Sequence, residues 1–150
     1  MSAKETMVEV IGSHNLMHIA TVDSGGMPCV RGVNYAGGDK ENILYFVTQK
    51  DSRKIGQLAV SSNIGFVIDH DCPTWEAVAK VKYIKGTGTA TLVKDPAEIQ
   101  KAFGLLMKKF PFLSDLPGDP SDFAVVKVEL KKVLVSDNTI SFGHTEEVNF

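Results

Sequence analysis

The sequence predicts a mainly β fold, an antiparallel barrel that is closed or partly closed and whose ends are covered by helices. Short runs of β-branched and aromatic residues follow one another closely, turns rich in glycine, proline and aspartate separate them, and three segments have helical periodicity. We count six or seven strands and three helices. A chain of 150 residues, 43% of them apolar, is long enough to bury a core of its own, so we expect one domain, residues 1–150.

Composition excludes several classes of protein. Sixteen basic and eighteen acidic residues give a net charge of −2, which argues against a nucleic-acid-binding module. Cys29 and Cys72 are too few for the disulfide framework of a small secreted fold. Residues 1–5 are polar and lack the apolar core of a signal peptide, and no apolar run approaches the ~20 residues that span a bilayer. We therefore expect a soluble, cytoplasmic protein with no membrane or nucleic-acid partner.

The first third of the chain is predicted to hold one helix and three strands. Apolar residues recur at helical spacing until Gly12, where the pattern ends. Turn residues then separate three runs of strand-forming residues, which we expect to pair in sequence as an antiparallel meander. The helix spans residues 3–12 and the strands span residues 17–22, 28–35 and 43–48. In the second strand Cys29, Arg31, Val33 and Tyr35 share one face.

The middle third is predicted to form a short helix and two strands. Residues 52–60 carry an apolar stripe of Ile55, Leu58 and Ala59, with Asp51 or Ser52 as the N-cap. Strands are expected at residues 63–69 and 77–93. Gly86 and Gly88 in the longer strand indicate a bend or a close approach of the backbone.

The last third contains the clearest helix start of the sequence. Asp95 is predicted to cap the helix, Pro96 to occupy its first position and Glu98 to close a capping box. Apolar residues at helical spacing continue to Phe110, and Pro111 ends the helix. A strand is expected at residues 123–135, followed by a hairpin turn at Asp137–Asn138 that leads into residues 139–142.

The segment from Thr48 to Lys54 has the composition of an anion site. It runs from a strand end into a helix start, where unpaired backbone N–H groups and the positive end of the helix dipole lie. Ser52 supplies a hydroxyl. Arg53 and Lys54 lie in the first helical turn, where a cation is unfavourable by about 0.3–1 kcal/mol unless it meets an anion. The alternative is a solvated basic turn.

Arg31 is the second candidate for anion binding. It lies in mid-strand on a face shared with apolar residues, so its guanidinium must either reach an edge of the sheet or meet an anion. Arginine is well suited to bidentate recognition of phosphate. Because one strand and one turn separate it from Ser52, the two residues could lie close together. An arginine at an exposed edge is the alternative.

These segments resemble a known family, the pyridoxamine 5′-phosphate oxidase-like split barrels. Gly26-Met-Pro28 and Arg31-Gly-Val33 are similar to the flavin-binding strand of that family. Leu44-Tyr-Phe-Val-Thr48, three spacers and then Ser52-Arg53-Lys54 with Gln57-Leu58 form the more specific match. The resemblance covers residues 15–142. It implies a six-stranded split barrel that dimerises and binds flavin mononucleotide (FMN) at the dimer interface.

The resemblance also implies a set of cofactor contacts. Arg31, Ser52, Arg53 and Lys54 would hold the phosphate, while residues 31–34 and 46–48 would line the ribityl chain and the isoalloxazine ring. We add Trp75, which is either a wall of the flavin site or part of an interface. The complete set of candidate cofactor-binding residues is Arg31, Gly32, Val33, Asn34, Phe46, Val47, Thr48, Ser52, Arg53, Lys54, Gln57 and Trp75.

The sequence departs from the oxidase proper at two places. Ala36 stands where the oxidase has a lysine, and residues 140–150, which include His144, do not carry the pattern of an arginine and a histidine that holds the pyridoxal substrate of the oxidase. The chain therefore resembles the small FMN-binding relatives linked to general stress and nitroimidazole reduction. We expect an FMN-dependent oxidoreductase of unknown substrate that reacts at flavin N5 and exchanges electrons with NAD(P)H or a small-molecule acceptor. A non-catalytic flavin or haem carrier, a sensor of redox stress and an F420-dependent reductase are the alternatives.

The remaining motifs give weaker evidence of a binding site. Asp69-His70-Asp71-Cys72 offers four metal ligands in a row, but neighbours on an extended chain point to opposite sides, so we expect no metal site there. Gly86-Thr87-Gly88 lacks the third glycine of a dinucleotide-binding loop. His18 is a typical partly buried histidine, with a haem ligand as the alternative. Lys80, Lys82, Lys131 and Lys132 are expected to lie on solvated faces.

Overall fold

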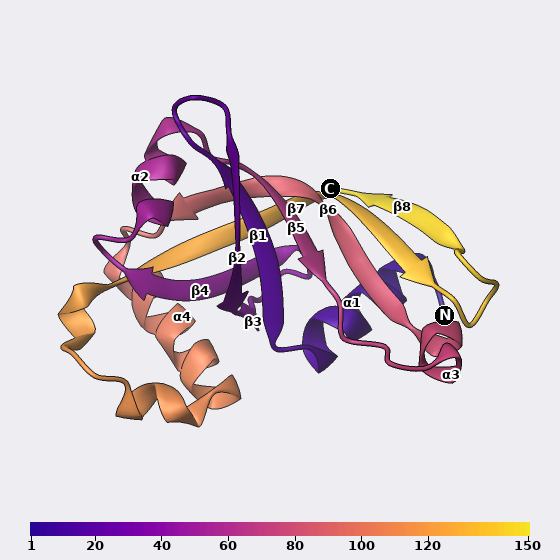
Figure 1. The fold of residues 1–150 in the computed structure, drawn as a ribbon. Helices are drawn as coiled ribbons and strands as arrows, with labels where there is room; N and C mark the ends of the chain where they lie inside the picture. Colours follow the sequence, from indigo (N-terminus) through magenta and orange to yellow (C-terminus); the bar gives the residue numbers. More distant parts are fainter.

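The computed structural model describes all residues, 1–150, and its central feature is a single curled antiparallel sheet with helices at its ends and over one side (Figure 1). The strands are β1 (Leu16–Val22), β2 (Pro28–Asn34), β3 (Ala36–Gly37), β4 (Ile43–Gln49), β5 (Asn63–Ile68), β6 (Lys82–Leu92), β7 (Phe123–Asp137) and β8 (Thr145–Asn149). The α-helices are α1 (Ala3–Ser13), α2 (Arg53–Val60), α3 (Trp75–Lys80) and α4 (Pro96–Lys109), and two short 3₁₀ helices are η1 (Pro111–Asp115) and η2 (Pro120–Asp122).

The predicted mainly β, antiparallel fold with flanking helices is confirmed, but the number of strands is larger than six. The strand order is β2-β1-β5-β6-β7-β4-β3, with β8 pairing with β7. Two short strands, β3 and β8, raise the number above six. The two-residue β3 pairs only with β4. The final strand β8 pairs with β7 and begins at Thr145, later in the sequence than the predicted residues 139–142.

The predicted meander of three consecutive strands is only partly correct. β1 and β2 form a hairpin in which Ile19 faces Arg31, and Asp23 closes the turn by accepting bonds from two backbone N–H groups. β4, in contrast, pairs with β7, about eighty residues away in the sequence. The sheet therefore has free edges at β2 and at β3, and the opening of the barrel lies between them.

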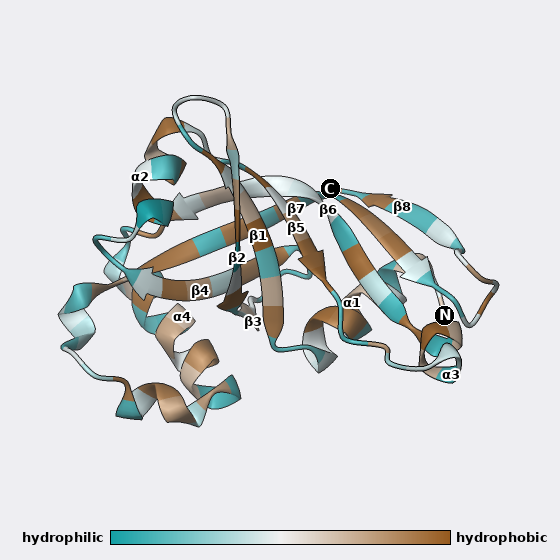
Figure 2. Cartoon of the chain, viewed as in Figure 1, coloured by the Kyte–Doolittle hydropathy of each residue, from teal (hydrophilic) through white to brown (hydrophobic).

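Two buried clusters stabilise the sheet. The larger fills the inside of the curl and contains residues from α1 and most strands, among them Met17, Ile19, Leu44 and Phe46. The smaller lies between β4 and α4 and includes Tyr45 and Leu106. β4 supplies residues to both clusters, so both of its faces are covered, as its near-continuous apolar run predicts. Figure 2 shows both hydrophobic and hydrophilic residues along β6 and β7.

Of the two alternatives predicted at Gly86 and Gly88, a bend or a close approach of the backbone, the close approach is confirmed. A Cβ atom on Gly86 would lie 1.9 Å from the carbonyl oxygen of Lys132, and one on Gly88 would lie 2.2 Å from that of Glu129. The register of β6 and β7 shifts between Thr87 and Gly88. Only glycine permits this approach of the two backbones, which curls the sheet.

The helices agree with the sequence except at α3 and in some details of their ends. Residues 77–80 were predicted to begin a strand but lie in α3, which Thr74 caps by accepting a bond from the Ala77 N–H. In α2 Leu58 is buried, whereas Ala59 is exposed. None of the helices is long and apolar enough to cross a membrane.

Two further predictions about chain ends need correction. Asp95 caps α4, but Glu98 does not close a capping box because its carboxylate instead accepts a bond from the Tyr45 hydroxyl at 2.7 Å. The turn after β7 begins as predicted, with Asp137 accepting bonds from Thr139. It continues to His144, however, so residues 139–142 belong to the turn and β8 starts at Thr145.

Candidate functional site

Arg31 is held at the mouth of the barrel by two side chains. It projects from β2 on the face that Ile19 and Val33 share with the core. Its guanidinium donates to Thr21 Oγ1 at 2.5 Å and to Gln57 Oε1 at 3.0 Å. Thr21 lies on β1 and Gln57 on α2, so three elements converge on this guanidinium.

The Gln57 amide is fixed at both of its ends. Its oxygen also accepts a bond from the Thr21 hydroxyl, and its nitrogen donates to the Cys29 sulfur at 3.3 Å. The two groups that accept bonds from the Arg31 guanidinium, the Thr21 hydroxyl and the Gln57 amide, are uncharged. The network therefore orients the Arg31 guanidinium without neutralising its charge.

The start of α2 lies next to this network and leaves hydrogen-bond donors free. Ser52 is the N-cap, as one of the two predictions had it, but its side chain makes no capping bond. Its hydroxyl oxygen instead accepts a bond from the Thr48 hydroxyl at 3.2 Å, so its own proton remains available. The first-turn N–H groups of any helix lack intrahelical partners. The turn thus presents a hydroxyl and backbone donors beside the cations.

Lys54 and Arg31 are close enough to repel each other. Partial burial, and then the nearby Arg31 charge, lower the pKa of Lys54 from its usual 10.5. None of the seven ion pairs in the structure includes Arg31, Arg53 or Lys54. Two neighbouring cations without a carboxylate partner are favourable where an anion binds between them.

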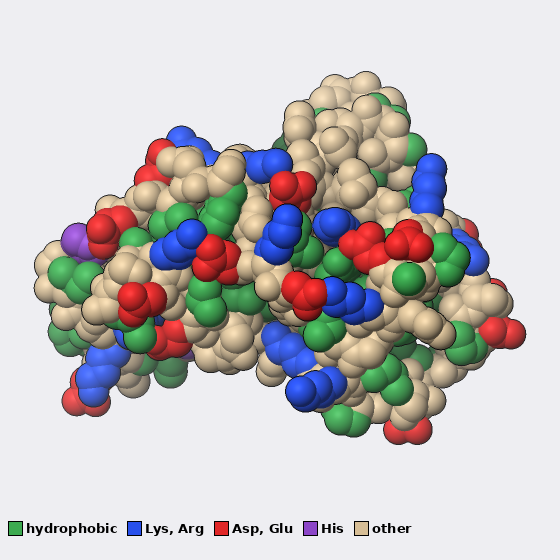
Figure 3. All heavy atoms as spheres, turned by 180° about the vertical axis from the view of Figure 1, so that it is seen from behind, with side chains coloured by type: hydrophobic (Ala, Val, Ile, Leu, Met, Phe, Trp, Pro, Cys, Tyr) green, Lys and Arg blue, Asp and Glu red, His purple; other side chains and the backbone are tan.

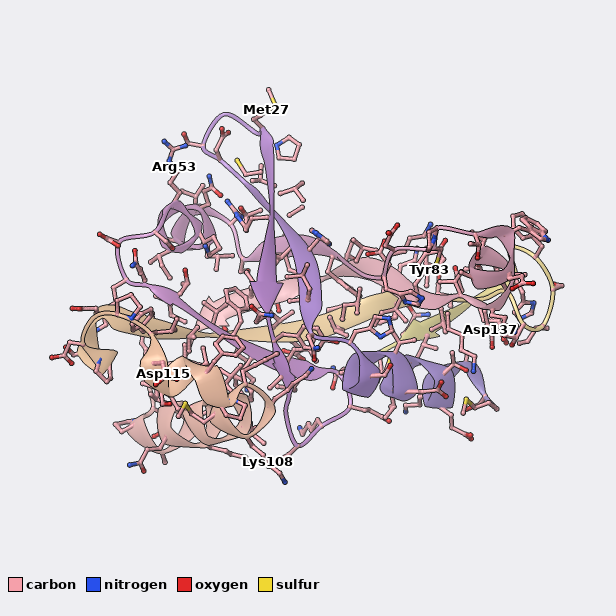
Figure 4. The ribbon with its side chains drawn as sticks, turned by 60° about the horizontal axis from the view of Figure 1, so that its bottom comes forward. Met27, Arg53, Tyr83, Lys108, Asp115 and Asp137 are labelled. Carbon is pink, nitrogen blue, oxygen red and sulfur yellow. The ribbon has the colours of Figure 1, made fainter.

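Arg53 is more exposed than Arg31 and Lys54. Its side chain extends from the start of α2 on the side of the β1–β2 turn, where Met27 is labelled (Figure 4). On the face seen from behind, cationic and anionic side chains are interspersed (Figure 3). We call Arg31, Thr48, Ser52, Lys54 and Gln57 the anion cluster.

The other candidate residues of β2 lie farther along the strand. The Val33 side chain is part of the core. The Asn34 side chain donates to the Asn15 carbonyl at 3.3 Å. Gly32 is exposed, and a Cβ atom there would lie 3.1 Å from Leu16. No hydrogen bond joins any of the three to the side chains of the anion cluster.

The three candidates on β4 have different surroundings. Phe46 is fully buried in the core. Val47 faces the other side of the sheet and lines a cavity of about 330 Å³ beneath α4. Phe46 and Thr48 share a face by strand alternation, and of these Thr48 bonds Ser52 of the anion cluster.

Trp75 lies at the other end of the sheet from α2 (Figure 1). It is the first residue of α3, and its ring packs against Phe142 at a centroid distance of 5.5 Å, with the two rings tilted by 35°. Both rings are about 70% exposed. Within one chain Trp75 is therefore not brought together with the anion cluster.

A shallow hollow lies on the outer face of the sheet, opposite the core. Its volume is about 560 Å³. A cross-strand row of mostly small residues runs through it in register, from Val30 through Ala20, Gly65 and Thr87 to Lys132. His18, Lys85 and Leu134 also line it. A second hollow of about 520 Å³ continues it and shares Ala20, Gly65 and Thr87.

Sequence reasoning missed two members of the site. Thr21 is almost fully buried and bonds both Arg31 and Gln57. In the sequence nothing distinguishes it from an ordinary threonine in a strand. Cys29 stood on the predicted inward face but had no assigned role. The alternation of β1 and β2 could have placed both beside Arg31. Their bonds to Gln57 depend on the docking of α2, which the sequence does not encode locally.

Comparison with known proteins gives one family and several similar folds. The haem-binding protein from Mycobacterium smegmatis has a TM-score of 0.81 at 17% identity, over 99% of this chain but 58% of its own. The haem storage protein from Vibrio cholerae has a TM-score of 0.71 at 16% identity, and the match covers 87% of this chain and 92% of that protein. A candidate 5-nitroimidazole antibiotic resistance protein from Bacteroides thetaiotaomicron has a TM-score of 0.71 at 14% identity, and the match covers 89% of this chain and 82% of that protein. At these identities the likeness concerns the fold.

The search of curated proteins finds no match. The model of the family described as pyridoxamine 5′-phosphate oxidase matches residues 3–137, which contain every strand from β1 to β7 and the whole anion cluster. With its curled antiparallel sheet, opening at β2 and flanking helices, this chain belongs to the pyridoxamine 5′-phosphate oxidase family.

Proposed function

We propose that this protein binds FMN through the anion cluster and acts as an oxidoreductase. The observation that carries the proposal is the pair of cations at Arg31 and Lys54, which lie close together without a carboxylate partner. The dianionic phosphate of FMN satisfies both charges. The fold, shared with a family that contains flavin-dependent enzymes, supports the proposal.

Each member of the cluster has a defined task in this proposal. Arg31, oriented by Thr21 and Gln57, donates to the phosphate through guanidinium N–H groups that its neighbours leave free. Lys54 supplies a second charge, and Ser52 donates its hydroxyl proton. Charge-assisted hydrogen bonds of this kind contribute about 1.5–3 kcal/mol each. Arg53, which is exposed, adds a longer-range attraction.

A second copy of the chain is part of the proposal. Only a few neighbouring side chains surround the anion cluster, and the outer face beside β2 is apolar and shallow. Val30 on that face is 67% exposed, and small residues form the floor of the hollow. A partner seated on this face would cover β2 and supply the second wall that an isoalloxazine ring needs. Trp75 would contribute to such a wall only from the partner's side.

The flavin supplies hydride and electron transfer when bound, and the protein supplies binding and access. We propose NAD(P)H or a small-molecule acceptor as the exchange partner. The vitamin B6 reaction is not proposed. Ala36 is buried beside β4, so no side chain at that position reaches a ligand, and residues 145–149 are paired with β7 as β8.

The visible spectrum of the purified protein, followed by anaerobic reduction with NADPH, tests the proposal. We expect flavin absorption that bleaches on reduction and returns with an acceptor. Mass spectrometry of the released cofactor separates FMN from F420. Lys54→Ala should release the cofactor, whereas Lys108→Ala, which removes an exposed lysine at the end of α4 (Figure 4), should retain it. Equal retention by both variants would overturn the assignment of the phosphate site.

Haem binding is the second candidate function, and the position of His18 favours it. His18 lies in the outer-face hollow, between apolar side chains and close to Lys85 and Lys132. An imidazole can ligate haem iron, and two lysines can pair with the haem carboxylates. The fold is similar to that of two proteins described as haem-binding and haem storage proteins.

Titration with haemin distinguishes the two candidates. A haem site at His18 predicts a Soret band that His18→Ala removes and that His144→Ala, at the far end of the sheet, leaves unchanged. If haemin gives no such band while FMN binds, the haem candidate is wrong. If His18→Ala leaves the band intact, the hollow is not the haem site.

A further inference from the structure

Two histidines far apart in the sequence meet at the surface, away from the anion cluster. His14 follows the last turn of α1, and His70 lies in the segment between β5 and α3. The distance between His14 Nε2 and His70 Nδ1 is 2.9 Å, and the ring centroids are 5.1 Å apart. Neither the family nor the proposed flavin chemistry accounts for this pair.

The surroundings of His14 assign its proton to Nδ1. His14 Nδ1 lies 2.9 Å from the carbonyl oxygen of Val10, which can only accept a bond, and 3.0 Å from the Ser13 hydroxyl, which can donate its own proton to the same carbonyl. His14 Nε2 therefore directs a lone pair at His70 Nδ1. A histidine that donates one ring N–H to a backbone carbonyl while the other nitrogen is free is the usual arrangement of a metal ligand.

The separation of the two nitrogens matches that of ligands on one metal ion. Imidazole nitrogens bind Zn²⁺ at about 2.0–2.1 Å, which for tetrahedral geometry puts two of them about 3.3 Å apart. The observed 2.9 Å needs only a small rotation of the exposed His70 ring. We propose that His14 and His70 form a binding site for a divalent ion of the Zn²⁺ or Cu²⁺ type, which imidazole ligands favour.

The ion takes the position of the proton that His70 Nδ1 donates to His14 Nε2. That proton moves through solvent to Nε2 of the exposed His70 ring, so both rings bind as neutral imidazoles and no net proton is released. No third His, Cys, Asp or Glu joins the pair in the structure, so water completes the coordination. Asp69 and Asp71 flank His70 and favour a cation, whereas Lys109, which donates to the His14 carbonyl at 2.6 Å, opposes it.

The bound ion would link the ends of two paired strands, because His14 precedes β1 and His70 follows β5, and these strands pair antiparallel. His14 lies at the junction of α1 and β1, and His70 lies five residues before Trp75. An ion between them would restrict the segment that positions α3 and the exposed Trp75 ring. Because a ligand that binds only the folded state stabilises it, the ion should also raise the melting temperature.

Cu²⁺ is a suitable probe because Trp75 is the single tryptophan of the chain. Titration of the metal-free protein with Cu²⁺ should quench Trp75 emission and saturate at one ion per chain. His14→Ala and His70→Ala should each raise the apparent dissociation constant more than about tenfold. The two remaining histidines provide matched controls, and His18→Ala and His144→Ala should leave the titration unchanged.

Three results would overturn the proposal. One is quenching that does not saturate, and another is equal quenching in the His70→Ala variant. The third is loss of quenching in His144→Ala alone. That result would place the ion at His144 and Glu146, where His144 Nε2 lies 2.9 Å from Glu146 Oε2. Since His70 is exposed on an irregular segment, His70→Ala is expected to fold even if His14→Ala does not. Binding of FMN does not enter this test, so its outcome is independent of the proposed function.

Discussion

The Arg31 guanidinium donates to the side-chain oxygen of Gln57 at 3.0 Å and thereby joins the edge strand β2 to helix α2. The same helix has Ser52 as its N-cap and Lys54 in its first turn. One hydrogen bond therefore fixes the position of two groups of the anion cluster relative to each other. A phosphate placed between them meets donors that are already oriented, which lowers the entropic cost of binding.

Removing the Gln57 side chain should weaken the binding of FMN without removing any charge. Gln57→Ala frees the Arg31 guanidinium from one of its two partners, and a lost hydrogen bond costs about 1–1.5 kcal/mol, which is roughly a tenfold rise in the dissociation constant. Gln57→Glu is the sharper variant, because its carboxylate pairs with Arg31 and competes with phosphate. It should be more stable than Gln57→Ala in urea and yet bind FMN no better. Tighter binding by Gln57→Glu would contradict this account.

The affinity for FMN should depend on pH through Lys54. The pKa of Lys54 lies below its usual 10.5 because burial and the Arg31 charge disfavour the cation. As the pH rises through this lowered pKa, the lysine loses its proton and the affinity should fall, at a lower pH than for an exposed lysine. In the Lys54→Arg variant the arginine keeps its charge over the whole pH range, so the affinity of this variant for FMN should not change with pH. Fluorescence titrations between about pH 7 and about pH 10 measure both curves.

The Tyr45–Glu98 bond should stabilise the packing of α4 on β4. Burial, and then the bond to Glu98, raise the pKa of Tyr45 to about 12, and the Tyr45 hydroxyl lowers the pKa of Glu98. Tyr45→Phe should cost about 0.5–1.5 kcal/mol of stability at neutral pH. A carboxyl whose pKa is lowered by folding stabilises the protein above its unfolded pKa and loses that contribution as the pH falls through the folded pKa.

The difference between wild type and Tyr45→Phe in urea denaturation should therefore shrink below about pH 4, near the pKa of an unfolded glutamate. Tyr83→Phe, at the other end of the sheet, is the matched control and should change little at any pH. A constant difference across the acid range would mean that the Tyr45 hydroxyl acts independently of the Glu98 charge.

The outer face of the sheet should carry the proposed dimer. Val30 is 67% exposed there, so Val30→Asp costs a monomer little but places a carboxylate in an interface, where its desolvation is unfavourable. We expect sedimentation to show a dimer for wild type and a monomer for Val30→Asp, with loss of bound FMN. Val8→Asp, on the exposed side of α1, should remain dimeric. A wild-type monomer that retains FMN would contradict both the dimer and the second wall.

Local patterns in the sequence predicted most of the elements. Alternation in β2 correctly put Cys29, Arg31 and Val33 on one face, and Asp95 with Pro96 marked the start of α4. α3 was missed because the apolar residues Ala77, Val78 and Ala79 run on into β6, although alanine itself favours a helix. Thr74, which caps α3, was the signal for it.

What the sequence did not predict depends on residues that are distant along the chain. β4 follows β2 after a short connection, which favours a hairpin, yet it pairs with β7 and leaves the barrel open between β2 and β3. The bond between Arg31 and Gln57 and the pair of His14 and His70 likewise need elements that only folding brings together. The separation of Trp75 from the anion cluster belongs to the same class.

The difference in affinity between FMN and riboflavin, which lacks the phosphate, tests the central claim most directly. The wild-type protein should bind FMN far more tightly than riboflavin. The double variant Arg31→Ala/Lys54→Ala should bind both equally, with its affinity for riboflavin unchanged from wild type. If wild type does not discriminate between the two flavins, or if the double variant still prefers FMN, then Arg31 and Lys54 do not hold the phosphate.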